Sequence, residues 1–472
     1  MTLPKDFIDD LSTYMETSEL KEFIHALTET EQTTCVRMNA SKGMTEDALP
    51  LVDATADNAL SPIGWNAEDG RYLKERPNFT TDPLLHAGCY YVQEASSQFI
   101  AHVVRSLVKE PVTALDLCAA PGGKSTALLT ALPDGSQLVS NEIDRRRARI
   151  LSENIAKWGS PDVSVTCNAP KDFRKLHSLF DVIVTDVPCS GEGMFRKDEG
   201  AVSDWSKEKV EGCVALQREI VDTIWPCLKP GGLLIYSTCT FNVHEDEENV
   251  AWICENLGGE CIEVPTDEAW NIRQPLIGER PCYRFLPHKT KGEGLFMACI
   301  RKDFQDAGMP TREPKNKDKG SKGKNAGKGG KNQLPDIKYE KWIDRKGSIE
   351  CTSEGSVRLI SEAHKPLHDA LASQGLFFLQ SGIEIGTIKG KDLIPAHALA
   401  LNTALKEEAF PRVSLDLETA LNYLRREAIV LPEGTPLGFV LVCYQNHPLG
   451  FVKNMGNRSN NLYPQEWRIR FL

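Results

Sequence analysis

Residues 112–125 read VTALDLCAAPGGKS: an apolar strand-like run, a turn of proline and glycine, and the start of a helix. The same alternation of strand and helix continues downstream. The further strand-like runs are residues 136–142, 163–168, 180–187, 231–239 and, as a closing strand, 294–302. Strands that alternate with helices are typical of a parallel sheet with helices on both faces. The sequence therefore predicts an α/β fold over residues 88–303.

The remaining chain is divided by a segment that cannot form a core. Residues 315–331 read KNKDKGSKGKNAGKGGK and hold no apolar residue larger than alanine, so we interpret residues 304–335 as a solvated Lys/Gly-rich linker. A sharper interpretation, in which this polycation also contacts phosphates, stays open. We expect a small α+β domain at residues 1–87 and a separate α+β region at residues 336–472.

The composition restricts the class of protein. With 41% hydrophobic residues, the 472-residue chain can bury a sizeable core, and no apolar run reaches the roughly 18 residues of a membrane span. The start, MTLPKDFIDDLSTYMETSEL, lacks the features of a signal peptide, so we expect a cytoplasmic protein without membrane contact. None of the 14 cysteines forms a C-x-x-C pair, and we predict no metal site. The net charge of −11 argues against a simple nucleic-acid binder, although a large enzyme can carry a local basic face.

The loop after the first strand, Cys118 to Ser125, stands where a doubly wound sheet binds its ligand. It lacks the G-x-G-x-x-G pattern of dinucleotide loops, and a P-loop would need glycine at the position of Cys118. Glu142 ends the second strand about 20 residues further on, where an acid can hold both ribose hydroxyls of an adenosine. An acid for the ribose without a diphosphate loop suggests S-adenosylmethionine as cofactor. The alternative is that Glu142 only caps the following helix.

Two later strands each end near a thiol. Asp186 and Cys189 follow one strand in VTDVPCSGEG, and Cys239 follows the next in GGLLIYSTCTF. A thiolate can add to C6 of a cytosine and so activate C5 for attack on a sulfonium methyl group, while an acid holds N3 and another group helps the adduct to collapse. We predict this chemistry for the two thiols and Asp186. Lys197 is a candidate cation that favours the thiolate, and its alternative is a solvated surface lysine.

At these residues the chain closely resembles the RNA cytosine-C5 methyltransferases of the Nol/Nop/Sun (RsmB/RsmF) family, and within it the bacterial RsmF-like 16S rRNA enzymes. The matching segments are RMN (37–39), YYVQEASS (90–97), LDLCAAPGGKS (115–125), SNEIDRRR (140–147), TDVPCSGEGMFRKD (185–198), YSTCTFNVHEDEEN (236–249) and RFLPHKTKGEGLFMA (284–298). The resemblance implies a Rossmann-like class I methyltransferase sheet and an RNA-binding N-terminal domain. It also implies an RsmF-type C-terminal domain at residues 336–408 and a PUA-like RNA-binding domain at residues 409–472.

The resemblance further implies a role for each site residue. Cys239 is the nucleophile, and Cys189 is the thiol that assists release. The implied contacts of S-adenosylmethionine are Cys118, Ala119, Ala120, Pro121, Gly122, Gly123, Lys124, Glu142 and Asp186. Many family members carry an aspartate near Asn168, so we predict that the Asn168 amide contacts the adenine instead. The implied partner is RNA, namely 16S rRNA or the small ribosomal subunit, and we expect a monomer.

Three other functions are alternatives for this sequence. A non-catalytic RNA-binding assembly factor would have a broken cofactor loop or a missing thiol. An amino-methyltransferase would carry a polar-Pro-Pro-aromatic motif where DVPC stands. The same cytosine chemistry on tRNA stays an alternative, because the catalytic residues do not exclude it.

Overall fold

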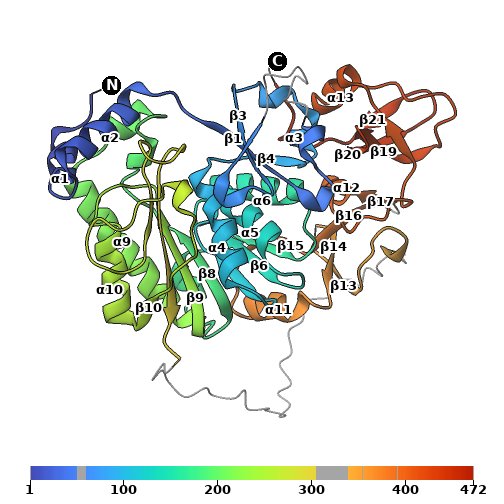
Figure 1. Ribbon diagram of the computed structural model, residues 1–472. Coiled ribbons are helices and arrows are strands. Elements are labelled where there is room, and N and C mark those ends of the chain that lie inside the picture. Colours follow the sequence, from blue (N-terminus) through green and yellow to red (C-terminus); the bar gives the residue numbers. More distant parts are fainter. Residues whose placement is uncertain (1, 50–59, 305–338, 353, 391, 471–472) are drawn as a thin grey trace, which may run out of the picture.

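The described residues form four sheets, the largest of which lies in the middle of the molecule (Figure 1). The computed structural model describes residues 2–49, 60–304, 339–352, 354–390 and 392–470. The predicted Lys-rich segment at residues 315–331 lies outside the described residues. Within the described part of the chain, no helix has both the length and the apolar character that a membrane crossing requires.

The largest sheet has nine strands and confirms the predicted α/β fold. Its strands are β5 (Thr113–Asp116), β6 (Gln137–Asn141), β7 (Val163–Thr166), β8 (Phe180–Asp186), β9 (Leu228–Thr238), β10 (Gly259–Cys261), β11 (Tyr283–Phe285), β12 (Leu295–Lys302) and β15 (Phe378–Ser381). They follow the order β10-β12-β9-β8-β5-β6-β7-β15, with β11 paired to β12. Five neighbouring strands of this order, β9, β8, β5, β6 and β7, pair in parallel. The others are antiparallel additions at the two edges. The chain reverses its direction of winding at β5, where such sheets bind ligands.

Alternate residues of the strands supply two cores, one on each face of the sheet. On β5, Ala114 belongs to one core and Leu115 to the other. The first core lies under α4 (Phe99–Leu107), α5 (Gly123–Ala131) and α6 (Arg145–Trp158). The second lies under α7 (Pro170–Phe173), α9 (Lys207–Ile224), α10 (Glu247–Leu257) and α11 (Lys365–Ser373).

The N-terminal part combines two helices with a small sheet. Its elements are α1 (Lys5–Leu11), α2 (Thr17–Glu29), α3 (Pro83–His86), β1 (Thr34–Met38), β2 (Ser61–Pro62), β3 (Gly70–Leu73) and β4 (Tyr90–Val92). Phe7 and Phe23 share a core with Phe195, which follows β8, and Phe241, which follows β9. Beside them lies α8 (Glu199–Ser203). The two N-terminal helices therefore cover the loops that carry the predicted thiols.

The C-terminal part forms two more sheets. The first contains β13 (Gly347–Cys351), β14 (Ser356–Ser361), β16 (Ile383–Lys389) and β17 (Asp392–Pro395). The second contains β18 (Arg412–Ser414), β19 (Gly438–Tyr444), β20 (His447–Asn454) and β21 (Ser459–Asn461). Besides α11, which covers the central sheet, the described helices of this part are α12 (His397–Leu401) and α13 (Leu417–Leu424).

The C-terminal region is less separate than the sequence suggested. Its strand β15 pairs with β7 and extends the central sheet, with Phe378 opposite Thr166 and Ser381 opposite Ser164. Tyr423 of α13 and Tyr90 of β4 belong to one core, so the last sheet also packs on the N-terminal part. The sequence did not reveal this arrangement because strand pairing across some 200 residues leaves no local pattern.

Candidate active site

A cavity of about 500 Å³ opens at the carboxyl ends of the central strands. Its lining includes Cys118 after β5, Glu142 after β6, Ala169 after β7, and Asp186 and Cys189 at the end of β8. Leu216 and Ile220 of α9 close one side. The cavity thus lies where the reversal of winding at β5 leads one to expect a ligand.

The predicted cofactor loop is held in place by α6. Asn154 donates to the Pro121 carbonyl at 2.7 Å, and Arg147 donates to the Ala120 carbonyl at 2.8 Å. Gly122 has a φ of 114°, and a Cβ there would come within 3.3 Å of Leu151. The turn into α5 therefore needs glycine at this position. Of the loop residues, Cys118 lines the cavity itself, while Ala119 to Gly123 shape the turn behind it.

Glu142 is buried at the edge of this cavity, and one of its carboxylate oxygens accepts no hydrogen bond from the described residues. Its Oε1 accepts the Asp144 amide at 3.0 Å, and its Oε2 lies 3.4 Å from Arg147 in an ion pair but has no hydrogen-bond donor among the described residues. The helix-capping alternative does not apply, because Asp144 caps α6 by accepting the amides of Arg146 and Arg147. A buried carboxylate oxygen without a donor suits the hydroxyl groups of a ribose.

Asp186 and Lys124 form an ion pair beside the cavity. The two charged groups are 2.8 Å apart, and Asp186 also accepts a hydrogen bond from the Ser237 hydroxyl at 2.9 Å. Burial lowers the pKa of Lys124, but the charge and hydrogen bond of Asp186 raise it overall, so the ammonium group stays charged. Lys124, which was predicted as a cofactor contact, therefore brings a cation close to Cys239, whose charge also acts on it.

The two predicted thiols meet. The sulfur atoms of Cys189 and Cys239 lie 3.3 Å apart, although 50 residues separate them in the chain. The hydrogen bond to Cys239 and burial raise the pKa of Cys189 well above its usual range. Cys189 is therefore the thiol of the pair that keeps its proton, and it can donate a hydrogen bond to the Cys239 sulfur. Burial also raises the pKa of the third thiol of the cavity, Cys118, which stays neutral.

Two buried carboxylates that the sequence analysis missed fix the thiol loops to each other. Glu192, from the loop of Cys189, accepts the amides of Phe241 at 2.6 Å and Asn242 at 3.1 Å, from the loop of Cys239. Glu245 accepts the Ser190 amide at 3.0 Å in the opposite direction. The only hint in the sequence was the presence of acids in SGEG and VHEDEEN, between segments that become buried.

Asp116, at the end of β5, was also missed. It is fully buried and accepts a hydrogen bond from the Ser125 hydroxyl at 2.6 Å, while its Oδ1 has no donor among the described residues. Burial raises its pKa to about 7, against the opposing effects of Ser125 and Lys124. A carboxylate in the strand before a cofactor loop was a signal that could have been used.

Two predicted residues lie differently from expectation. Lys197 has an exposed side chain, and the cation near the thiols is Lys124, whose side chain is 11% exposed. The Asn168 side chain pairs with the backbone of Phe377, donating to its carbonyl at 3.1 Å and accepting its amide at 2.9 Å. Its amide group is therefore engaged with the C-terminal part, and a contact with adenine stays a prediction.

Three family models match successive parts of the chain. Residues 107–301 match the family described as 16S rRNA methyltransferase RsmB/F. Residues 3–95 match the N-terminal domain of 16S rRNA methyltransferase RsmF, and residues 410–469 match the methyltransferase RsmF PUA domain. The chain belongs to the RsmB/RsmF methyltransferase family. The predicted resemblance is confirmed, and with it the methyltransferase sheet and the PUA domain.

Curated relatives of this family span nearly the whole chain. The ribosomal RNA small subunit methyltransferase F of Escherichia coli O157:H7 is 29% identical over 444 residues, which are 91% of this chain and 89% of the relative. The protein of the same name from Shigella flexneri serotype 5b is 28% identical, with the same coverage.

Solved structures share the fold. NSun6 from Pyrococcus horikoshii with SFG superposes with a TM-score of 0.55 at 19% identity, covering 64% of this chain and 99% of its own. A methyltransferase homologue from the same organism gives a TM-score of 0.51 at 24% identity, covering 64% of this chain and all of its own.

Methyltransferases of the RsmB/RsmF family use S-adenosylmethionine, and the cavity fits this cofactor. Glu142 offers a buried oxygen to ribose hydroxyls, and the loop from Cys118 to Lys124 has no diphosphate-binding pattern. Exposed Ile143 and half-buried Ala169 provide apolar surface where the carboxyl ends of β6 and β7 meet the cavity.

Proposed function

We propose that this methyltransferase acts in the cytoplasm on C5 of a cytosine in 16S rRNA, through a covalent bond between a cysteine and C6 of the base. One observation carries the proposal: two thiols from separate strands lie 3.3 Å apart beside the cofactor cavity. A single thiol suffices for attack, so a second one in contact with it suggests a reaction in which the bond to the base must also be broken. The names of the relatives support ribosomal RNA as the substrate.

The cavity would hold S-adenosylmethionine by its ribose at Glu142 and beside the loop that starts at Cys118. When bound, this cofactor supplies a methyl group on a sulfonium centre, which is an electrophile for carbon. The remaining chemistry belongs to the chain itself. Its task is to turn C5 of cytosine, a poor nucleophile, into a carbon that can take the methyl group.

Cys239 is the nucleophile in this proposal. Its sulfur forms a bond to C6, and the electron pair of the C5–C6 double bond becomes available at C5. Cys189 donates a hydrogen bond to that sulfur before attack, and the charged Lys124 lies near it, so both favour the thiolate. Asp186 holds the N3 side of the base by accepting a hydrogen bond from the neighbouring amino group of the cytosine, and its carboxylate is itself fixed by Lys124 and Ser237.

Release reverses the first step. After methyl transfer, a water molecule takes the C5 proton, the electron pair of the C5–H bond restores the C5–C6 double bond, and the C6–sulfur bond breaks with its pair on Cys239. Cys189 assists this collapse, since its sulfur lies within 3.3 Å of the sulfur that leaves. The hydrogen bonds of Glu192 and Glu245 between the two loops keep the sulfur atoms close together during both steps.

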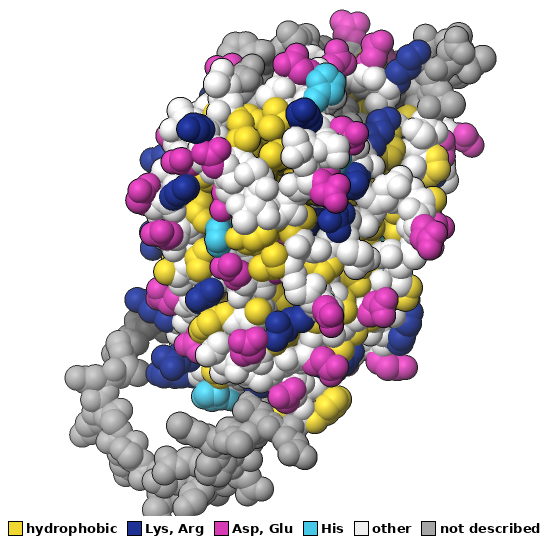
Figure 2. Space-filling model, turned by 60° about the vertical axis from the view of Figure 1, so that its left-hand side comes forward, with side chains coloured by type: hydrophobic (Ala, Val, Ile, Leu, Met, Phe, Trp, Pro, Cys, Tyr) yellow, Lys and Arg dark blue, Asp and Glu magenta, His cyan; other side chains and the backbone are white. Residues whose placement is uncertain are grey.

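In this proposal the PUA domain binds the RNA, and no overall positive charge of the protein is needed to attract it. Figure 2 shows basic and acidic side chains interspersed over the face that carries the N-terminal helices, in keeping with the net charge of −11. In the C-terminal part, Arg458, Arg468 and Arg470 are exposed and Lys453 is half-buried. Such side chains suit phosphate contacts. The target base must leave its stack to reach the cavity, which costs a few kcal/mol.

Bisulfite sequencing of total RNA from cells with and without this gene tests the proposal. We expect one or more 5-methylcytosines of 16S rRNA to disappear and to return when the gene is restored, but not when the restored gene carries Cys239→Ser. A loss confined to tRNA would move the substrate to the alternative. No change in any RNA would contradict the cytosine-C5 assignment.

A further inference from the structure

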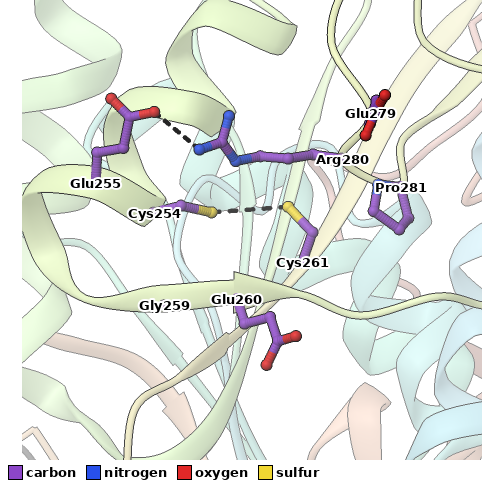
Figure 3. A pocket seen from close by; sticks show the side chains of 8 residues that line it. All are labelled: Cys254, Glu255, Gly259, Glu260, Cys261, Glu279, Arg280 and Pro281. Atoms are coloured by element: carbon purple, nitrogen blue, oxygen red, sulfur yellow. Dashed lines mark hydrogen bonds and ion pairs between the residues drawn. The ribbon is translucent and has the colours of Figure 1, made fainter.

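A second pair of close thiols lies outside the active site. The sulfur atoms of Cys254 and Cys261 are 3.7 Å apart, and both side chains are partly exposed. Cys254 lies in the last turn of α10, and Cys261 is the last residue of β10. Figure 3 shows the two side chains pointing toward one another in a pocket, with the Arg280 side chain above them.

The pocket is open and charged. It has a volume of about 600 Å³, and its lining includes Glu255, Glu260, Glu279 and Arg280. Arg280 pairs with Glu255 at 2.8 Å, and both groups are exposed. A small polar reagent can therefore reach the sulfur atoms from solvent.

We propose that Cys254 and Cys261 form a redox-active dithiol, which hydrogen peroxide or another hydroperoxide oxidises to a reversible disulfide. Three features support this: the short distance between the sulfur atoms, the open pocket, and the position of β10. This strand has three residues and lies at the edge of the sheet, paired with β12 alone among the described strands. An edge strand beside a helix end can move, so the sulfur atoms can approach to the ~2.05 Å of a disulfide.

The two thiols have different parts in this reaction. The hydrogen bond from Cys261 lowers the pKa of Cys254; burial opposes this, and the Arg280 charge adds to it. The same hydrogen bond and burial raise the pKa of Cys261. Cys254 is therefore the thiolate that attacks, and Cys261 is the protonated partner that resolves.

The oxidation proceeds in two displacements. The Cys254 sulfur attacks one peroxide oxygen, the O–O bond breaks, and hydroxide leaves, so that Cys254 becomes a sulfenic acid. The Cys261 sulfur then attacks the Cys254 sulfur, the S–O bond breaks, and hydroxide leaves and takes up the Cys261 proton as water. The hydroxide of the first step takes up the proton that Cys254 released on ionising. Two electrons thus pass from the two thiols to hydrogen peroxide, which is reduced to two molecules of water, whereas an alkyl hydroperoxide gives one alcohol and one water.

Peptide mapping of the full-length protein tests the proposal. Trypsin is unsuitable, because no lysine or arginine stands between Lys229 and Arg273 and both thiols stay in one peptide with Cys239. Cleavage after glutamate separates them, since Glu255 and Glu260 lie between Cys254 and Cys261. After brief treatment with hydrogen peroxide and blocking of free thiols, we expect residues 249–255 linked to residues 261–263, and separation of the two peptides by dithiothreitol.

Variants separate the roles of the two thiols. In Cys261→Ser, a sulfenic acid should persist at Cys254 and react with dimedone; in Cys254→Ser, Cys261 should stay unlabelled. Arg280→Gln should slow the oxidation by about 10-fold for each unit that the pKa of Cys254 rises. The matched control Glu255→Gln removes the neighbouring negative charge and should not slow it. A melting curve for each variant checks that it folds.

The internal reference is Cys213, a partly exposed thiol whose pKa burial raises to about 11. It should stay reduced while the linked peptide forms. The proposal is overturned if no linked peptide appears when Cys213 is already oxidised, or if Cys261 reacts equally fast without Cys254.

Discussion

Two pairs of thiols in one domain share the same local arrangement. In each pair, one thiol stays protonated and is placed to donate a hydrogen bond to the other sulfur atom. Cys189 lies 3.3 Å from Cys239 in this way, and Cys261 lies 3.7 Å from Cys254. Each accepting sulfur has a cation nearby, which is Lys124 in the first pair and Arg280 in the second.

The pairs differ in what surrounds them. The Cys189–Cys239 pair lies beside a cavity that fits a nucleoside, with the Lys124–Asp186 ion pair nearby and with Glu192 joining the two thiol loops. Exposed Arg280 and a three-residue edge strand hold the second pair in an open pocket. Each proposed reaction thus begins at a sulfur atom that has a protonated thiol and a cation beside it. Its enclosure and its neighbours then decide whether it meets a base or an oxidant.

The largest expected effect separates the pairs by activity. Cys239→Ser should lower methylation on the order of 10³-fold or more, because it removes the nucleophile. Cys189→Ala should still attack and transfer the methyl group, then stall with the RNA attached. Denaturing electrophoresis with labelled RNA should show a slow band for Cys189→Ala and none for Cys239→Ser or the double variant.

The second pair supplies the control for this experiment. Cys254→Ser and Cys261→Ser should methylate at the rate of the unaltered enzyme, since both thiols lie outside the cavity. If Cys239→Ser accumulates the band and Cys189→Ala does not, the two roles are reversed. If neither catalytic variant loses activity, the covalent route is wrong.

The hydrogen bonds by which Glu192 joins the two thiol loops should also contribute to the free energy of unfolding. Glu192→Ala leaves the Trp205 indole and the Phe241 and Asn242 amides without their buried acceptor. At about 1–3 kcal/mol for an unsatisfied buried donor, the free energy of unfolding should fall by about 3 kcal/mol. Urea unfolding measures this. Glu260→Gln, an exposed carboxylate near the second pair, should change it by less than about 0.5 kcal/mol. If the two variants lowered the free energy of unfolding equally, the hydrogen bonds of Glu192 would not be what distinguishes the surroundings of the two thiol pairs.

Cofactor binding should protect one pair and not the other. S-adenosylhomocysteine in the cavity should slow alkylation of Cys189 and leave Cys254 as reactive as before. Glu142→Ala should weaken cofactor binding roughly 10-fold or more, since hydrogen bonds to a charged group are worth about 1.5–3 kcal/mol. Calorimetry and alkylation followed by mass spectrometry check the two statements. Asp144→Ala is the matched control, because it removes the cap of α6 but leaves the cavity lining. Unchanged affinity in Glu142→Ala would disprove the ribose assignment.

Much of this arrangement could be predicted from the sequence, and the reasons for the rest are physical. Strand ends in a parallel sheet share one edge, so Asp186, Cys189 and Cys239 were placed together from their patterns alone. The buried acids Glu192 and Glu245 were not found, because their partners are backbone amides of another loop. The pairing of Asn168 with Phe377 depends on β15, which joins the sheet from beyond the linker. Lys124 was assigned to the cofactor, yet its ion pair with Asp186 is a long-range contact that no spacing predicts.

The smallest expected effect concerns the two ends of α10, one near each thiol pair. At its start, His244 lies between Asp10 of α1 at 3.2 Å and Glu248 at 3.1 Å, with the Tyr14 ring beside it. The hydrogen bond to Asp10 raises the pKa of His244 to about 9; partial burial opposes this shift, and Glu248 adds to it. The folded-state pKa lies above the unfolded value of about 6.5, so the bound proton stabilises the fold. This contribution is fully present below about pH 6.5 and is lost as the pH rises through about 9. Because the imidazole is more than a third exposed, the gain in the free energy of unfolding should stay below about 1 kcal/mol.

Urea unfolding of the native protein and His244→Gln should therefore show a small difference in the free energy of unfolding at pH 6 that vanishes by pH 10. A difference for His244→Gln that stays constant with pH would mean that the charge of His244 has no part in holding α1 over the catalytic loops.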